Sequence, residues 1–512
     1  MFRAALLAAS LLVSAPALAQ KTTLNVGIAA QDSGKLDPHF AVSTIDRIPV
    51  AWMFNALVRF PPGSIDPAKI EPDLAESWDT SPDKKTWTFH LRHGVQFHGG
   101  YGELTADDVV FSLKKAGDAK TSAFSSELRP IESIEAVDPY TVKIVLKENV
   151  PSLLGTLVNY SQGFIVSRKA VEKLGDGFAR APIGTGPFAF ASLTPNQSLE
   201  LVAHDKYFRG KPKLEKISYR FLPSDASRDL AFQNGELDLN YGRADQTWVN
   251  RTKQLPHTVV DIFEPAEEAQ LHLNTAAKPF DDIRVRQALA MAVNRPELVK
   301  WRGQDVSREA QSVVPRGYLG FTADNGLLGT DVAKAKQLLA DAGYPNGLTV
   351  KVIQSQLPEM LTAMQVFQAQ LKRAGINLDL QVVEHATFHA QIRQDLSPLV
   401  YYSAARFPIA DVTLTQFFHS RSIVKTPTAV TNFSHCNVAD SEIDAARTEP
   451  DPKKQIALWQ EAQRKIVAAV CAVPMFETLL VFAHHDNLDY GYKLEGSLSL
   501  GPLITEATHF SR

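Results

Sequence analysis

The sequence predicts an α/β protein with two lobes or domains, and three observations lead to this class. The chain has 512 residues, of which 45% are hydrophobic and 21% charged, a globular composition with material for large cores. Between residues 86 and 146, short stretches alternate apolar and polar residues, as strands do. Residues 348–382 follow a strand–helix–strand pattern, which predicts a pair of parallel strands.

Residues 1–19 have the pattern of a cleavable signal peptide. Arg3 precedes a short apolar run that ends in the sequence ALA at residues 17–19, a pattern that signal peptidase cleaves. The run is shorter than the roughly 20 residues that span a bilayer, and no later segment qualifies. Because Gln20 rather than cysteine follows the cleavage site, we expect a mature chain without a lipid anchor, free in a bacterial periplasm.

The charge of the chain argues against two classes of partner. The formal net charge is only −3, without the basic excess that nucleic acid or anionic lipid would require. We therefore expect neither nucleic acid nor anionic lipid as a partner, and the lack of a long apolar segment predicts no direct insertion into a membrane.

The first elements are a strand over residues 23–28 and a long polar and aromatic loop over residues 36–54. Further on, the stretch TWTFHLRHGVQFHGG at residues 86–100 holds three histidines within nine residues. Its rings alternate with polar residues, which predicts a strand, and Gly94 offers a turn. On this pattern the histidines occupy the polar face and the connections. A zinc or nickel site is the alternative, and it would require the alternation to fail.

Two further patterns follow in the first half. Thr105 precedes a helical stretch with acids in its first turn and lysines in its last, which complement the helix dipole. Residues 131–146 predict a hairpin that turns at Asp138. The glycine-rich sequence IGTGPF at residues 183–188 lacks a phosphate-binding fingerprint, so we interpret it as a turn that enters a strand.

The second half has clearer periodicities. Residues 331–343 place apolar side chains on one helical stripe, which ends at Gly343. A strand, a helix and a second strand follow over residues 348–382, with Gly375 ending the helix. In open α/β sheets, ligands tend to bind beyond the carboxyl ends of such strands.

The two cysteines, Cys436 and Cys471, are either bridged or free. An exported protein favours a disulfide. Between the cysteines lie a short and a long helical pattern separated by EPDP, which predicts an antiparallel helix pair that could bring the two sulfurs together. The sequence does not fix the distance between the Cα atoms that a bridge needs.

Several segments together resemble the family 5 extracellular solute-binding proteins, the peptide and nickel class that serves ABC importers. The similarity runs through nearly the whole mature chain and keeps the order of the family's motifs. The segments are PDLAESWDTSPDKKTWTFHLRHGVQFHGG, LTADDVVFSL, GTGPFAF, HDKYFRGKPKLEKISYRFLPSDASRDLAFQNGELDL and LNTAAKPFDDIRVRQALAMAVNR.

The resemblance implies a two-lobed periplasmic binding protein fold of type II, cluster C, with an extra subdomain in the N-terminal lobe. It places lobe I in residues 20–275 and 486–512, with the subdomain at about 60–180, and lobe II in residues 276–485. Chain crossings near Thr275 and Asn487 would then form the hinge. It also implies that the 86–100 region is structural.

The family does not decide the ligand, and the matching segment departs from the peptide-binding pattern. In YYSAARFPIADVTL, Arg406 stands where an acid that pairs with a peptide amine is often found, and Ser403 stands near a family Trp. A guanidinium offers two parallel donors to a carboxylate or phosphate, so a carboxylate-bearing solute becomes a candidate. Alternatively, Arg406 is a surface residue or pairs with Asp411.

Other candidate ligand contacts rest on the same resemblance. Aromatic walls with a few directed polar groups are typical of small-molecule pockets. Strand alternation allows only one of the adjacent residues Tyr401 and Tyr402 to face a ligand. Any of the aromatic candidates could be a core residue instead. The candidates are Tyr401, Tyr402, Phe407, Asp411, His39 and Phe40.

Neither catalysis nor a bound metal is expected. His385 and His389 have i, i+4 spacing without the zincin glutamate, so direct nickel coordination is the less favoured reading. No nucleophile elbow, S-x-x-K set or P-loop occurs. We expect a monomeric, cofactor-free carrier that binds a short peptide or small solute and delivers it to inner-membrane permease subunits. A sensor, a chaperone of the same fold and a nickel-chelate binder remain alternatives.

Overall fold

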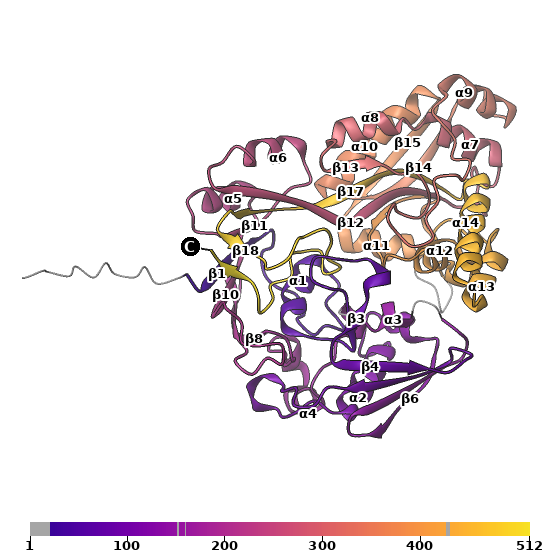
Figure 1. Ribbon diagram of the computed structural model, residues 1–512. Helices are drawn as coiled ribbons and strands as arrows, with labels where there is room; N and C mark the ends of the chain where they lie inside the picture. The colour runs from indigo at the N-terminus through magenta and orange to yellow at the C-terminus, as the bar shows by residue number, and fades with distance from the viewer. Residues whose placement is uncertain (1–20, 151–152, 159, 426–430, 512) are drawn as a thin grey trace, which may run out of the picture.

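The computed structural model describes residues 21–150, 153–158, 160–425 and 431–511, and Figure 1 shows two lobes joined by two long strands. The joining strands are β12 (Thr258–Leu273) and β17 (Ala472–His485), which run antiparallel to each other. None of the described helices is long and apolar enough to cross a membrane.

The main sheet extends through both lobes with the strand order β16-β12-β17-β11-β1-β10-β9-β8, and β13 pairs with β17. β1 runs parallel to β10 and β11, as in α/β sheets, and confirms the strand expected at residues 23–28. The remaining strands are β8 (Phe188–Thr194), β9 (Ser198–Ala203), β10 (Lys216–Phe221), β11 (Leu239–Tyr241), β13 (Ser307–Glu309), β16 (Leu399–Ala404) and β1 (Thr23–Ile28).

Lobe I packs helices on its part of the sheet: α1 (Thr44–Met53), α4 (Arg168–Leu174), α5 (Asp225–Gln233) and α6 (Gln246–Thr252). The short strand pair of β18 (Leu488–Asp489) with β19 (His509–Phe510) completes it, whereas β2 (Val58–Arg59) and β3 (Glu71–Pro72) pair at the subdomain, whose core contains Val58. The prediction of a loop over residues 36–54 was wrong for its second half. Ser43 caps α1 by accepting a hydrogen bond from the Asp46 amide, and the helix continues through Pro49, whose ring usually ends a helix.

A separate subdomain, drawn at the bottom of Figure 1, has its own hydrophobic core. Its antiparallel sheet has the order β4-β5-β7-β6, which confirms the predicted strand and hairpin. Thr105 is the N-cap of its helix, as predicted, and forms a capping box with Asp108. The elements are β4 (Ala75–Thr80), β5 (Thr86–Leu91), β6 (Ile131–Asp138), β7 (Thr141–Leu146), α2 (Ala106–Gly117) and α3 (Leu153–Thr156).

The three histidines of residues 86–100 lie apart, each with its own partner. His90 pairs with Asp79 on the exposed face, and the His93 ring stacks on Tyr140. His98 is buried, and its Nε2 lies 2.9 Å from the carbonyl oxygen of Gly186. This region has the structural role that the strand pattern predicted.

Lobe II contains the predicted strand–helix–strand unit. β14 (Leu348–Ser355) and β15 (Ile376–Val383) pair in parallel, and α10 (Pro358–Arg373) connects them. These two strands form a sheet of their own rather than joining the main sheet. The other helices are α7 (Ile283–Ala292), α8 (Arg295–Arg302), α9 (Val332–Asp341), α11 (His385–Arg393), α12 (Ala410–Phe418), α13 (Asp440–Thr448) and α14 (Pro452–Ala468).

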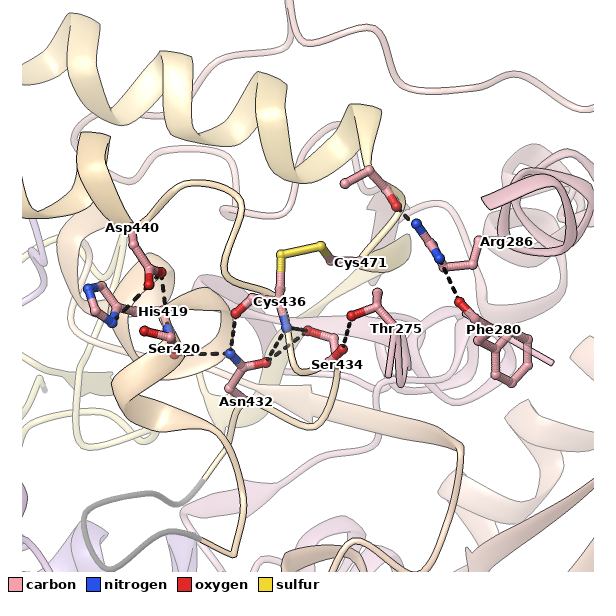
Figure 2. Close-up of a disulfide and its surroundings, with 11 residues drawn as sticks. Thr275, Phe280, Arg286, His419, Ser420, Asn432, Ser434, Cys436, Asp440 and Cys471 are labelled. Atoms are coloured by element: carbon pink, nitrogen blue, oxygen red, sulfur yellow. Dashed lines mark hydrogen bonds and ion pairs between the residues drawn. A yellow bond between two sulfur atoms is a disulfide. The ribbon is translucent and has the colours of Figure 1, made fainter. Parts of the chain in front are cut away.

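A disulfide joins Cys436 to Cys471, with 5.8 Å between their Cα atoms (Figure 2). The predicted helix pair, α13 and α14, lies between the two cysteines and folds back on itself. The side chain of Asn432 donates hydrogen bonds to the carbonyl oxygens of Cys436 and His419, which fixes the loop that leads to the bridge.

The two hydrophobic cores meet in the middle of β12 and β17. Phe263 and Phe482 belong to the core of lobe I, whereas Ala269 and Phe476 belong to that of lobe II. A register shift separates the two halves of β12, and Arg308 of β13 pairs there with both Glu264 and Glu477. We therefore propose that the chain crosses between lobes within these strands, not near Thr275 and Asn487, because each strand passes through both cores.

Candidate functional site

A small cavity lies in lobe II next to its boundary with the subdomain. The cavity offers a volume of about 20 Å³ to the centre of a water-sized group, which is room for about one such group. The residues that line it come from β12, β16, α12, the loop between β13 and α9, and the loop between β16 and α12. They are Glu268, Gln270, His272, Pro315, Tyr318, Tyr402, Ala404, Arg406, Thr413 and Phe417.

Strand alternation explains which side chains reach this cavity. On β12, Glu268, Gln270 and His272 point to the cavity, while the residues between them belong to the hydrophobic core. On the neighbouring strand β16, Tyr402 lines the cavity, and Tyr401 packs against Phe367 in the core. The sequence prediction that only one of the two tyrosines could face a ligand is consistent with this arrangement.

Arg406 lies at the rim of the cavity and is held by its neighbours. Its backbone N–H donates to the Tyr318 hydroxyl, which in turn donates to the Arg406 carbonyl oxygen at 2.7 Å. Nε donates to Gln416 Oε1 at 2.7 Å, and the guanidinium lies 5.1 Å from the centre of the Phe417 ring. Arg406 forms no ion pair with any carboxylate that the structure describes, although its charge acts on the buried carboxyls of Glu127 and Glu267 nearby.

Four buried polar atoms of the cavity wall have no hydrogen-bond partner among the described residues. Each belongs to a side chain that is at most 5% exposed. A buried polar group without a partner costs about 1–3 kcal/mol, so these atoms indicate a site that another molecule fills. The atoms are Glu268 Oε2, Gln270 Oε1, His272 Nδ1 and Thr413 Oγ1.

Burial keeps the titratable groups of the cavity close to neutrality. Burial, and then the nearby Glu477 carboxyl, raise the pKa of Glu268 well above its usual value. Burial lowers the pKa of His272 to about 3, because its ring lies among Phe417, Phe418 and Phe433. Arg406 is therefore the strong positive charge at this cavity.

Lobe II contacts the subdomain beside the cavity. Gln416 accepts from Arg406 and donates to Glu127 Oε1 of the subdomain at 2.7 Å. The Phe407 ring stacks on Phe60, with 5.7 Å between ring centres, and lies against Gly155, where no side chain could fit. These contacts close the gap between the lobes around Arg406.

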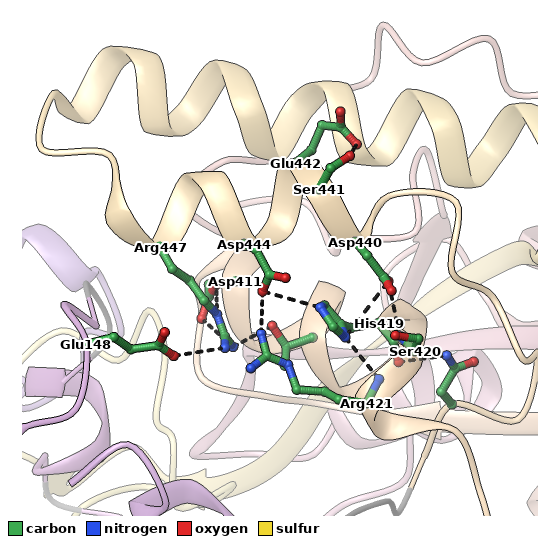
Figure 3. Close-up of polar contacts among 12 residues, drawn as sticks. Glu148, Asp411, His419, Ser420, Arg421, Asp440, Ser441, Glu442, Asp444 and Arg447 are labelled. Carbon is green, nitrogen blue, oxygen red and sulfur yellow. Dashed lines mark hydrogen bonds and ion pairs between the residues drawn. The ribbon is translucent and has the colours of Figure 1, made fainter. Parts of the chain in front are cut away.

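A second contact between the lobes involves Arg447 of α13, shown in Figure 3. Its guanidinium lies 4.0 Å from Glu148 of the subdomain and 3.1 Å from Asp411. Asp411 is buried, does not line the cavity and accepts a hydrogen bond from Arg447 Nε. Its partner is therefore Arg447 and not Arg406.

The structure brings Arg406 and Tyr402 to the cavity but separates the other predicted contacts from it. Phe407 faces the subdomain, and Tyr401 is a core residue. His39 is fully buried, with Nε2 3.1 Å from the Phe164 carbonyl oxygen, so this placement does not support a ligand contact. Phe40 lies under Lys35 and Lys115 instead.

The polar wall formed by β12 was missed from the sequence. In AEEAQLHL, the polar Glu268, Gln270 and His272 alternate with apolar residues, which is typical of a half-exposed strand. Only the observation that both faces are buried reveals these side chains as a candidate site. Thr413 gave no signal, because α12 brings it to the cavity from a distant segment.

His385 and His389 lie on one face of α11, as their spacing predicted. Their Nε2 atoms are 3.2 Å apart, and Ser355 Oγ is 2.9 Å from His385 Nδ1. Among the described residues, no group of three or more histidine, cysteine, aspartate or glutamate side chains is arranged to hold a metal ion.

The chain belongs to the bacterial extracellular solute-binding proteins, family 5, whose model matches residues 69–424. It is 28% identical over 499 residues to the glutathione-binding protein GsiB of Salmonella typhimurium, covering 95% of this chain and 94% of the relative. The two-lobed α/β fold is that of type II periplasmic binding proteins.

Two solved structures are similar over almost the whole chain. MoaA of A. tumefaciens R10, in complex with mannopinic acid, is 54% identical with a TM-score of 0.89, covering 96% of this chain and 100% of that one. DppA of Helicobacter pylori, in complex with the peptide STSA, is 26% identical with a TM-score of 0.83, covering 96% and 99%.

Proposed function

We propose that this protein is the periplasmic ligand-capturing component of an ABC importer and that its solute is small and carries a carboxylate. The observation that carries the proposal is Arg406, a half-buried guanidinium at the rim of a polar cavity, which forms no ion pair with a carboxylate among the described residues. A guanidinium binds a carboxylate through two parallel hydrogen bonds and repels the amine of a peptide.

The similar structures support an acid as the ligand. MoaA, at 54% identity, was solved with mannopinic acid, and AgaA of the same organism, at 26% identity, was solved with agropinic acid. Mannopinic acid is therefore the first candidate for this chain. Relatives that bind glutathione or a peptide are 28% and 26% identical and define the main alternative.

The mode of action follows from the lobe contacts. A solute held by lobe II would add contacts to lobe I only when the lobes close, so binding favours the closed form. Closure brings Gln416 against Glu127 and Phe407 against Phe60 beside the bound solute. The closed protein then presents the solute to the membrane permease, which receives its energy from ATP hydrolysis. The protein releases its solute unchanged and is not an enzyme.

Isothermal titration calorimetry tests this function with mannopinic acid, agropinic acid, glutathione and the peptide STSA. We expect the two acids to bind, and Arg406→Ala to weaken binding roughly 10- to 100-fold, because a hydrogen bond to a charged group contributes about 1.5–3 kcal/mol. Arg373→Ala is the control and leaves affinity unchanged; it breaks an exposed ion pair between the C-terminal end of α10 and Glu297 of α8. Tight binding of STSA that is indifferent to Arg406→Ala would refute the proposal.

A further inference from the structure

We infer that the cavity beneath Arg406 is a selectivity subsite that receives a hydroxyl-bearing arm of the solute. This inference rests on the proposed function, since it assumes that Arg406 holds the acid group of the same solute. The inference concerns the other part of the solute, which enters lobe II and carries a group that donates and accepts hydrogen bonds. The expected ligand class is a polyhydroxylated carboxylic acid.

The first argument is the convergence of unpartnered atoms. Two elements, β12 and α12, contribute the four residues Glu268, Gln270, His272 and Thr413. Each residue has one buried polar atom without a hydrogen-bond partner, and all four residues line the same cavity. An apolar arm would leave all four unsatisfied, at a cost for each atom. A polar group in the cavity removes this cost for each atom with which it forms a hydrogen bond.

The second argument concerns hydrogen-bonding type. The Gln270 amide nitrogen already donates to Glu268 Oε1 at 2.9 Å and to the Val313 carbonyl oxygen at 3.1 Å. Its oxygen therefore requires a donor, which a carboxylate cannot supply. Thr413 can donate or accept, as can neutral His272 or a protonated Glu268. A hydroxyl group donates one hydrogen bond and accepts two, so it can donate to Gln270 Oε1 and accept from two of the other groups, which a carboxylate or an apolar group cannot do.

The third argument is charge and size. The cavity wall is close to neutral, since burial disfavours ionisation of both Glu268 and His272. A neutral arm enters without an uncompensated charge, whereas a second carboxylate would be buried beside Glu268. The available 20 Å³ fits about one hydroxyl-sized group, so the rest of the solute lies outside, toward Arg406.

Three six-carbon probes separate the two halves of the solute. Gluconate has a carboxylate and hydroxyls, hexanoate has only the carboxylate, and sorbitol has only hydroxyls. Binding is measured by saturation-transfer NMR and by thermal shift at concentrations up to about 10 mM. We expect gluconate to bind at least tenfold more tightly than hexanoate.

Thr413→Val removes one cavity hydroxyl at constant shape. We expect it to weaken gluconate about two- to tenfold, the effect of one hydrogen bond, and to leave hexanoate unchanged. Gln270→Met gives the same pattern if Thr413→Val fails to fold. Thr362→Val, at an exposed position of α10, is the matched control and changes neither affinity.

The outcomes distinguish this inference from the proposed function. If hexanoate binds as well as gluconate and Thr413→Val changes neither, the cavity holds only water and the inference is wrong, while the acid-binding function stands. If sorbitol binds as well as gluconate and Arg406→Ala has no effect, the proposed function fails and the hydroxyl subsite remains. If none of the three probes binds, the hydroxyl subsite is overturned, and the calorimetry with mannopinic acid decides the proposed function separately.

Discussion

The stacked pair of Phe407 and Phe60 is predicted to stabilise the closed form rather than to touch the solute. Phe407 comes from lobe II and Phe60 from the core of the subdomain, with 5.7 Å between ring centres and 24° between ring planes. Because the two rings belong to different lobes, their contact exists only when the lobes are closed. Phe407→Ala should therefore shift the equilibrium toward the open form.

The size of this effect follows from the contact. An aromatic pair contributes about 0.5–1.5 kcal/mol beyond the burial of its surface, so loss of the cross-lobe contact costs about 1–2 kcal/mol of closure free energy. That corresponds to a roughly 5- to 30-fold lower ratio of closed to open forms and an affinity weakened by a similar factor. Phe60→Ala should have a similar effect, although Phe60 does not line the cavity.

A double-mutant cycle gives the decisive test. Affinities for the bound acid are measured for the wild type, Phe407→Ala, Phe60→Ala and the double variant. We expect a coupling of about 1 kcal/mol, because each single change removes the same contact. If Phe407→Ala weakens binding while Phe60→Ala does not, Phe407 contacts the solute directly and the closure reasoning is wrong.

Two further predictions concern stability. Replacing Cys436 and Cys471 with alanine opens a loop of 35 residues, and loop entropy predicts a loss of about 4 kcal/mol in denaturant unfolding. The wild type unfolded in the presence of a reductant should show most of this loss of unfolding free energy. A loss under 1 kcal/mol would contradict the predicted stabilisation by the disulfide. His272 has a folded pKa of about 3, below its usual 6.5, so its stabilising effect is complete above pH 6.5 and is lost as pH falls toward 3. At pH 4.5 this lowers the free energy of unfolding by roughly 2–3 kcal/mol relative to pH 7.5. In His272→Gln this difference between the two pH values should disappear. If the variant keeps the pH dependence of the wild type, His272 does not have this role.

Local patterns in the sequence predicted the elements well, because periodicity and caps depend on neighbouring residues. The parallel pair of β14 and β15 and the capping box at Thr105 are examples. The helix α1 was missed because Pro49 lies inside it. The crossing that we propose within β12 and β17 gave no signal in the sequence, because β12 continues from one core into the other and no local composition change marks that point.

The candidate site was only partly predictable. Arg406 was found because it replaces an acid in a recognisable segment, and alternation limited the choice between Tyr401 and Tyr402 without deciding it. Burial decided it, since Tyr401 packs in the core. The polar atoms of Glu268 and Thr413 meet only through packing of β12 against α12, which is a long-range contact that periodicity cannot reveal.

Small-angle scattering with and without mannopinic acid tests the central claim that two lobes close around an acid solute. The ligand-free protein should be larger than the closed structure described here, and the acid should reduce its radius of gyration to the value calculated from this structure. If the acid binds and the radius of gyration stays the same, closure does not accompany capture and the account is wrong.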